Sequence, residues 1–328
     1  MGVLYMDLMS LYYFSELAKD LNMTKTANRL FISQQTLSNH ILRLENYYGV
    51  KLFYRKPSLS LTYAGEHVLA YANTLNREDT NLKDILSDIQ HQERGVLRFG
   101  ASTLRMNTCL PEVLTEFSSR YPNVEIRITE KNSKPLEELI LNGDIDLAII
   151  LHGVENPSIE KKHLMSDQIY LCVTDTLLHE YYGKEIGYLK KSVSPGAYVK
   201  DFSKLPFCIL KNRMGQTIQA CFDDAGFVPR TYTTSAHIQI STSIGLKGIA
   251  ACFATRTSLI NQKSLIPKDI NIFPLLLNGK PLTQQVSIIH HKDRYLTSYN
   301  QYFLDLITDY FQKIELMPIE NIANTITS

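Results

Sequence analysis

The fold of this chain is decided by residues 24–65, TKTANRLFISQQTLSNHILRLENYYGVKLFYRKPSLSLTYAG. Thr24 is a good N-cap, so a short helix is predicted to begin there. Its apolar residues recur at positions i, i+3 and i+4 and should be buried: Ala27, Leu30 and Phe31. Ser33 can cap a second helix after a tight turn. The stretch therefore predicts a helix, a turn and a second helix.

The second helix has an apolar stripe of Leu37, Ile41 and Leu44. Its other faces carry short amide and hydroxyl side chains, which can make paired hydrogen bonds to base edges in the major groove of DNA. With Ser33, the residues expected to contact DNA on this helix are Gln34, Gln35, Thr36, Ser38, Asn39 and Arg43. An ordinary helix pair with a solvated polar face is the alternative.

A hairpin is predicted directly after the second helix. Gly49 is a C-cap glycine, and the two alternating stretches 50–57 and 58–62 flank a Pro-Ser turn. Arg55 and Lys56 lie near the tip, where they suit a phosphate or the narrow minor groove. The whole pattern predicts a winged helix-turn-helix that binds double-stranded DNA.

The charge of residues 21–62 supports binding to DNA. Residues 21–62 contain six Lys and Arg against one carboxylate, Glu45, a local charge of +5, whereas the whole chain carries only +1. A near-neutral protein with one basic segment is expected to dock on nucleic acid at that segment.

The same residues resemble the LysR-type transcriptional regulators. The matching motifs are Met6-Asp7-Leu8, Tyr13-Phe14, Thr24-x-x-Ala27-x-x-Leu30, Ser33-Gln34, Leu37-Ser38-x-x-Ile41-x-x-Leu44-Glu45, Gly49-Val50-x-Leu52-Phe53-x-Arg55 and Leu61-Thr62-x-Ala64-Gly65. The family usually has proline where this chain has Gln35. Glutamine is compatible with the first turn of a helix, but it alters the contacts available to DNA.

A long linker helix is expected from about residue 63 to residue 92, capped by Thr62. Its apolar seam is narrow, with three residues seven apart: Leu75, Leu82 and Ile89. A narrow seam favours packing against another helix, although packing within its own domain is the alternative. The resemblance implies antiparallel pairing of two chains as a homodimer, and tetramers through the C-terminal domains. The polar break at 91–95 is the expected hinge.

Beyond the hinge, strands and helices alternate. Strands are predicted at 96–100, 124–129, 146–151, 168–174, 206–210, 230–234, 249–253 and 285–290, with helices marked by Leu110, Leu114 and Phe117 and by Leu136, Leu139 and Ile140. The first three strands form a parallel βαβαβ sheet. The predicted fold class is thus α/β after an N-terminal winged helix. The predicted domains are 1–62 (DNA-binding), 63–94 (linker) and 95–328 (two lobes, about 95–165 with 268–328, and about 166–267).

The resemblance continues through this region. It rests on Leu97-Arg98-x-Gly100, Pro111, Phe117, Tyr121-Pro122, Gly143-Asp144-x-Asp146-Leu147-Ala148-Ile149, Gly226-Phe227 and Gly248-Ile249. It implies a two-lobed effector domain like that of periplasmic solute-binding proteins. Leu246, Phe253 and the tyrosine-rich stretch 177–204 depart from the family pattern, so the second lobe is the least defined.

A small-molecule effector is expected between the lobes, where helix N-termini follow the strands. The candidate effector residues are Ser102, Thr103, Asn212, Arg213, Gln216, Thr217 and Ser235. Arg105 and Arg213 can pair with an anionic effector. The alternative is that the hydroxyls are ordinary N-caps and the arginines are solvated.

The sequence gives little indication of a metal site, a reactive thiol or a catalytic site. The five cysteines, Cys109, Cys172, Cys208, Cys221 and Cys252, have no metal-site spacing and are expected to be buried thiols. A thiol-based redox sensor is the open alternative. His290 and His291 lack a third metal ligand at suitable spacing. No catalytic residues, metal or cofactor are predicted, and the chain is not expected to be an enzyme.

The chain has no signal peptide and no apolar run near 18 residues, so it is expected to be cytoplasmic and not to contact a membrane. The rival class, an extracytoplasmic solute-binding protein, would leave residues 1–92 without a role. The expected partners are an inverted-repeat DNA operator, an effector, RNA polymerase and a second copy of the chain.

Overall fold

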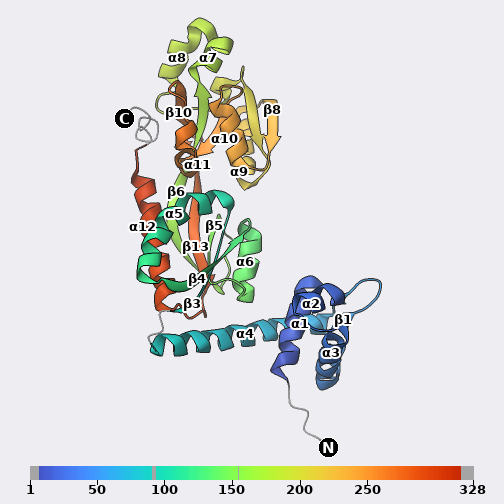
Figure 1. Cartoon of the computed structure of the whole chain (residues 1–328). Coiled ribbons are helices and arrows are strands. Elements are labelled where there is room, and N and C mark those ends of the chain that lie inside the picture. The colour runs from blue at the N-terminus through green and yellow to red at the C-terminus, as the bar shows by residue number, and fades with distance from the viewer. Residues whose placement is uncertain (1–6, 91–93, 154, 319–328) are drawn as a thin grey trace, which may run out of the picture. The chain divides into compact units, whose positions relative to one another are not determined.

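The computed structural model describes residues 7–90, 94–153 and 155–318. The described residues divide into two compact units: the first comprises residues 7–90 with 141–144 and 293–297, and the second comprises the others (Figure 1). Of the predicted hinge at 91–95, residues 91–93 lie outside the described residues.

The first unit is a helix-turn-helix with a wing. Its elements are α1 (Leu8–Asp20), α2 (Met23–Arg29), α3 (Gln34–Tyr48), β1 (Phe53–Tyr54), β2 (Ser60–Leu61) and α4 (Tyr63–Ile89). Ser33 caps α3 by accepting a hydrogen bond from the Thr36 N–H at 3.0 Å, and Thr62 caps α4. Gly49 ends α3 with a φ of 69°. The predicted second helix, the hairpin and the caps Ser33, Gly49 and Thr62 are therefore confirmed.

Two details of the predicted turn are wrong. The N-cap of α2 is Asn22, whose carboxamide oxygen accepts from the Lys25 N–H at 2.9 Å, and Thr24 lies inside the helix. Phe31 is 96% exposed and has a φ of 55°. The chain enters the left-handed region there to reach α3, which turns the ring away from the side on which Ala27 is buried.

The core of this unit is built from α1, α3 and the wing. Phe14, Leu37, Ile41 and Leu52 are almost completely buried within it. Leu75 of α4 is half-buried and packs against this same core, which agrees with the alternative of packing within its own domain. α4 ends at Ile89, short of the predicted end.

The second unit begins with a parallel sheet. Its first elements are β3 (Arg94–Ala101), α5 (Thr103–Arg120), β4 (Asn123–Glu130), α6 (Ser133–Asn142) and β5 (Leu147–Leu151). β3 pairs in parallel with both β4 and β5, as predicted. The C-terminal helix α12 (Ser298–Leu316) lies beside α5 over one face of this sheet, and α6 covers the other (Figure 1). We call this part lobe I.

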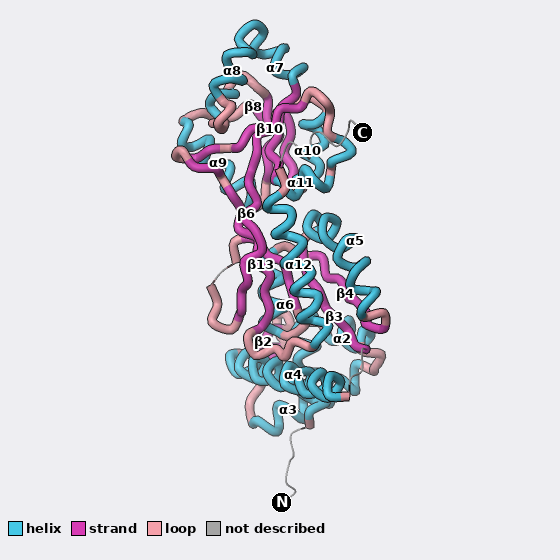
Figure 2. The backbone as a smooth tube through the Cα atoms, turned by 90° about the vertical axis from the view of Figure 1, so that its left-hand side faces the viewer, coloured by secondary structure: helices cyan, strands magenta, loops and turns pink. Residues whose placement is uncertain are grey.

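Strand β6 (Ile159–Thr174) is longer than predicted and runs through both lobes (Figure 2). Residues 159–168 pair antiparallel with β13 (Thr283–His291), and residues 169–174 pair with β9 (Cys252–Thr255) and β10 (Ile270–Pro274). Its first half is exposed and polar, which is why its sequence does not display a strand pattern. Two strands, β6 and β13, thus connect lobe I with the elements that follow.

Those elements form lobe II. They are α7 (Asp175–Tyr182), α8 (Ile186–Ser192), β7 (Pro206–Leu210), α9 (Arg213–Ala225), β8 (Arg230–Ser235), α10 (Ile238–Leu246), β9, α11 (Arg256–Asn261) and β10, with the small β11 (Leu276–Leu277) and β12 (Lys280–Pro281) and three short 3₁₀ turns. The predicted strand at 249–253 is shifted toward the C-terminus, and β10 was not predicted. The stretch 177–204 folds as helices whose apolar residues enter the lobe II core.

No helix in the described part of the chain combines the length and the apolar character that a membrane span requires.

Candidate nucleic-acid interface and effector site

The exposed face of α3 carries the predicted DNA-contacting residues. Leu37, Ile41 and Leu44 are buried, whereas the polar set is exposed except for the half-buried Ser38. Among the described residues, the amides of Gln35 and Asn39 have no hydrogen-bond partner. They lie four residues apart, one turn of helix, so both are available on one side of α3.

A groove of about 410 Å³ lies beside this helix. Gln34 and Ser38 line it from α3, Asn22 from the start of α2, and Arg55 from the wing. The Gln34 carboxamide oxygen accepts from the Thr24 hydroxyl at 3.5 Å, which orients the Gln34 amide at the entrance of α3. The groove brings the helix and the wing residue together, as the sequence predicts for a DNA-binding surface.

Glu45 connects α3 to the wing, a role that the sequence did not reveal. Its buried carboxylate accepts from the Leu52 N–H at 3.0 Å and from the Lys51 ammonium at 2.8 Å, and it lies 3.9 Å from the Arg55 guanidinium. Burial raises the pKa of Glu45, but the hydrogen bonds from Lys51 and the backbone more than offset this and leave the pKa below its usual value. A charged Glu45 fixes the root of the wing relative to α3.

The local charge of +5 overstates the basic surface. Lys25 pairs with Asp20 at 2.9 Å, and Arg29 pairs with Asp20 at 2.7 Å and also with Glu16. Both acids lie outside the window counted in the sequence. Hydrogen bonds from Lys25, Arg29 and Thr26 lower the pKa of Asp20 to about 2, so the pairing persists at neutral pH. The remaining basic residues of the surface are Arg43, Arg55, Lys56 and the Glu45-paired Lys51.

The predicted effector residues fall into two groups in the second unit. In lobe I, Ser102 is the N-cap residue of α5 and makes no side-chain cap bond, while the Thr103 hydroxyl donates to Glu130. In lobe II, Asn212 caps α9 through a 2.9 Å bond from the Gly215 N–H and donates to the Ala236 carbonyl at 2.8 Å. The two groups lie at helix N-termini, as predicted.

Three other predicted effector residues have local roles in lobe II. The Thr217 hydroxyl donates to the Arg213 carbonyl at 3.2 Å, so Thr217 is not a cap residue. The Ser235 hydroxyl accepts from the His237 N–H at 3.0 Å at the end of β8. Gln216 is exposed.

Arg213 extends from α9 to lobe I. Its guanidinium donates to the backbone carbonyls of Leu151 and, at 3.4 Å, His152, at the end of β5. No carboxylate of the described residues lies within ion-pair distance of it. Burial, and then the positive charge of Arg213, lower the pKa of the His152 imidazole and favour its neutral form.

Arg105 is not available to an effector, contrary to expectation. It is 2% exposed, and its guanidinium donates to Asp167 of β6 at 3.1 Å. The same carboxylate accepts from the Thr257 hydroxyl of α11 at 2.7 Å and from the Thr257 N–H at 3.2 Å. These three residues join α5, the connecting strand β6 and α11 in a buried polar cluster.

The cysteines are all buried and free, as predicted. Burial raises the pKa of Cys109 and of Cys208 to about 12, and that of Cys221 to about 11. Cys172 and Cys252 lie opposite each other on β6 and β9, both without solvent access. Peroxide reacts with exposed thiolates, so these environments do not favour the redox-sensor alternative.

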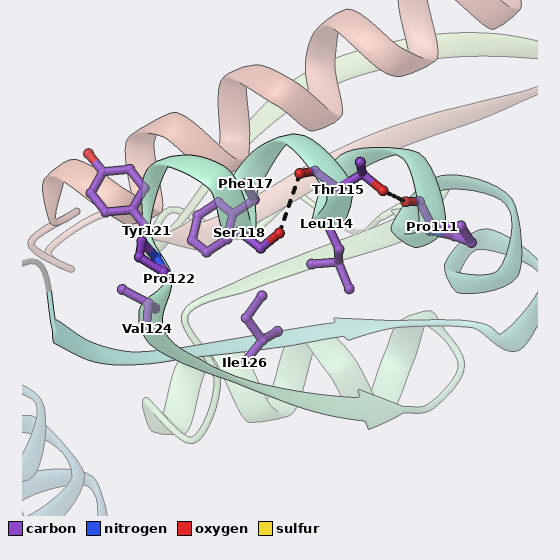
Figure 3. A pocket seen from close by; sticks show the side chains of 9 residues that line it. All are labelled: Pro111, Leu114, Thr115, Phe117, Ser118, Tyr121, Pro122, Val124 and Ile126. Carbon is purple, nitrogen blue, oxygen red and sulfur yellow. Dashed lines mark hydrogen bonds between the residues drawn. The ribbon is translucent and has the colours of Figure 1, made fainter.

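An apolar depression of about 360 Å³ lies on lobe I between α5 and β4 (Figure 3). Its lining includes Leu114, Phe117, Tyr121, Val124 and Ile126. It is formed by the C-terminal half of α5 and the first residues of β4, so it lies at the opposite end of these elements from Ser102 and Thr103. The sequence did not indicate it.

Comparison with known proteins decides the family. A model described as "Bacterial regulatory helix-turn-helix protein, lysR family" matches residues 8–66, and one described as "LysR substrate binding domain" matches residues 90–312. The chain belongs to the family of LysR-type transcriptional regulators. Such regulators combine a DNA-binding helix-turn-helix with an effector-binding domain, and their activity is not enzymatic.

Relatives match over most of the chain. The uncharacterized HTH-type transcriptional regulator YcgK of Bacillus subtilis is 25% identical over 92% of this chain and 94% of its own length. A full-length OxyR variant from Pseudomonas aeruginosa has a TM-score of 0.67 at 18% identity, covering 94% of this chain and 95% of its own. Full-length CbnR complexed with its target DNA has a TM-score of 0.56 at 19% identity, covering 93% and 100%. At these identities the solved structures support the fold.

Proposed function

We propose that this LysR-type regulator binds an inverted-repeat operator as a dimer or tetramer and responds to a small molecule bound between lobes I and II. The proposal also includes the domain boundaries given by the sequence and a contact with RNA polymerase at the promoter. The observation that carries the DNA-binding part is the pair of unpartnered amides, Gln35 and Asn39, on the exposed face of α3. CbnR, which shares this fold, is described in complex with its target DNA.

The base-reading set in this proposal is the polar face of α3, with Arg55 and Lys56 of the wing on the backbone or minor groove. An amide can bond an adenine edge with both its donor and its acceptor. Gln35 adds a backbone N–H at the first turn of α3, which proline would not supply. Gln35 should therefore read a base pair through hydrogen bonds, whereas a proline at this position could contact that base pair only through apolar atoms.

Dimerisation is proposed to use the distal part of α4. Leu82, Leu86 and Ile89 are 55%, 49% and 67% exposed and follow one side of the helix. Leu75 does not belong to this seam, because it packs on its own domain. Two α4 helices, one from each chain, would cover the remaining residues and place two winged helices on one duplex.

Selection of duplexes from a pool of degenerate sequence by the full-length protein tests the DNA-binding part. We expect an inverted repeat whose half-sites are separated by whole turns of the double helix. Recovery of unrelated sequences, with equal affinity for all of them, would contradict it.

The effector part rests on the polar helix N-termini of α5 and α9. Thr103→Val keeps the shape of the side chain but removes the hydroxyl. If that hydroxyl contacts the effector, the variant should lose about 1 to 3 kcal/mol of effector binding and keep its operator affinity. A normal ligand-dependent footprint from this variant would contradict the placement of Thr103 in the site.

A further inference from the structure

Two charged side chains of opposite sign lie near residues 151–153, at and just after the end of β5. Arg213 arrives from α9 of lobe II, and Glu137 arrives from α6 of lobe I. Neither has an oppositely charged partner among the described residues.

Arg213 is a cation bonded to neutral groups. The Nη1 group of its guanidinium donates to the carbonyls of Leu151 and His152, which are neutral and supply no counter-charge. A guanidinium binds a carboxylate with two parallel hydrogen bonds, which are stronger than bonds to neutral carbonyls. An incoming carboxylate can therefore displace the two carbonyls from Arg213.

Glu137 is a buried acceptor without a donor. The residue is only 9% exposed, and its Oε1 atom has no hydrogen-bond partner among the described residues. That atom faces Gly153, because a Cβ on Gly153 would lie 3.3 Å from it. Buried polar atoms in folded proteins are nearly always hydrogen-bonded, so this oxygen indicates a missing donor.

We propose that the effector is a small zwitterion of the amino-acid class, whose carboxylate binds Arg213 and whose ammonium group binds Glu137. The proposal rests on the proposed function, since it specifies the ligand of the effector domain. An ammonium group has three donors and needs three acceptors. Glu137 supplies one, and the carbonyls of Leu151 and His152, released by Arg213, supply the other two.

The charges also exclude simpler ligands at this position. A dicarboxylate would place its second negative charge against Glu137, and a diamine would place a positive charge against Arg213. Like charges that are partly removed from water repel strongly. A zwitterion is complementary to both groups and binds residues of both lobes, so it would favour the arrangement in which α9 and β5 are close.

Thermal unfolding of the full-length protein tests the ligand class. The probes are the twenty common L-amino acids, and succinate, citrate and putrescine serve as probes that carry only one type of charge. We expect at least one amino acid to raise the melting temperature. Its methyl ester and its N-acetyl derivative should each bind at least about tenfold more weakly, since each lacks one charge.

Two variants assign the charges. Arg213→Gln should bind the active amino acid and its methyl ester equally, and Glu137→Gln should bind the amino acid and its N-acetyl derivative equally. Lys211→Gln and Glu138→Gln, exposed neighbours of each residue, are the matched controls and should keep the wild-type preferences. These ratios compare ligands on one variant, so a general loss of stability does not affect them.

Two outcomes would overturn the proposal. One is that succinate, citrate or putrescine raises the melting temperature and no amino acid does. The effector domain would then bind a different class of ligand. The other is full discrimination against the ester and the acetyl derivative in both variants. Failure of the proposed function itself would be distinct, since a broad metabolite library would then change neither stability nor DNA binding.

Discussion

The recognition face of α3 and the boundary between lobes I and II present their polar groups in opposite ways. On α3, the amides of Gln35 and Asn39 are exposed and have no partner in the part of the chain that the structure describes. At the lobe boundary, Arg105 is buried against Asp167, and Arg213 is bonded to backbone carbonyls. One surface is ready for its partner, whereas the other is closed by contacts within the protein.

The difference follows from the ligands. DNA has the same shape and charge everywhere, so a protein can present a fixed set of polar groups to it. A small molecule that changes the arrangement of two lobes must replace contacts that already hold them. Its site is therefore expected to contain groups whose present bonds can be exchanged.

The largest expected effect is on assembly. Leu82→Glu places a charge in the proposed seam of α4, which should separate the chains. Loss of the second DNA-binding unit should weaken operator binding by about 10² to 10⁴, the usual contribution of linked sites. Sedimentation and operator titration measure both effects.

Thr74→Glu is the matched control for that variant, because it adds the same single negative charge at an exposed, neutral position of α4. If Leu82→Glu still forms dimers with normal operator affinity, the exposed apolar residues of α4 do not form the dimer interface.

Asp167→Leu tests how firmly the lobe boundary is closed. The change leaves Arg105 buried without its counter-charge, which should cost about 3 to 5 kcal/mol of the free energy of unfolding. Denaturant unfolding of the full chain measures this. The double variant Arg105→Met/Asp167→Leu should recover most of the loss, since it removes both charges. If Asp167→Leu is as stable as the double variant, the charges of Arg105 and Asp167 are not tightly coupled.

The recognition face should show smaller effects, confined to DNA. Asn39→Ala or Gln35→Ala should reduce the discrimination between operator and random duplex by about 1 to 3 kcal/mol. Arg55→Ala should weaken binding to both duplexes. Asn46→Ala, exposed near the end of α3, is the control and should change neither. Equal losses on both duplexes from Gln35→Ala and Asn39→Ala would mean that α3 does not read bases.

The smallest expected effect concerns the acids of the first unit. The pKa of Asp20 is lowered from 3.8 to about 2, so its charged form contributes to stability above about pH 4 and loses that contribution as the pH falls toward 2. Asp20→Asn should cost less than about 1 kcal/mol at neutral pH, because the pair is close to solvent. The difference from wild type should shrink as the pH falls from about 4 to about 2; a constant difference would contradict the pairing.

The features predicted best from the sequence are those that depend on residues adjacent in the chain. Ser33, Gly49 and Thr62 were identified because a cap depends on the few residues beside it. Phe31 was misplaced because helical spacing was extended past Arg29, the last residue of α2, into the turn. The first half of β6 was missed because it is exposed and polar.

The lobe boundary was harder to predict, because its contacts join distant parts of the chain. Arg105 meets a carboxylate 62 residues away, and Arg213 meets a carbonyl 62 residues away. No local pattern marks such a partner. Glu137 was not identified either, since a single carboxylate on a helix has no distinguishing spacing.

The central claim is that this chain reads a DNA sequence, and the ratio of its affinities for a selected operator and for a scrambled duplex tests it most directly. The two titrations should be made at the same near-physiological salt concentration, because phosphate contacts make both affinities salt-dependent. We expect a ratio of about 10³ or more, in the range of specific regulators. A ratio near one would contradict it.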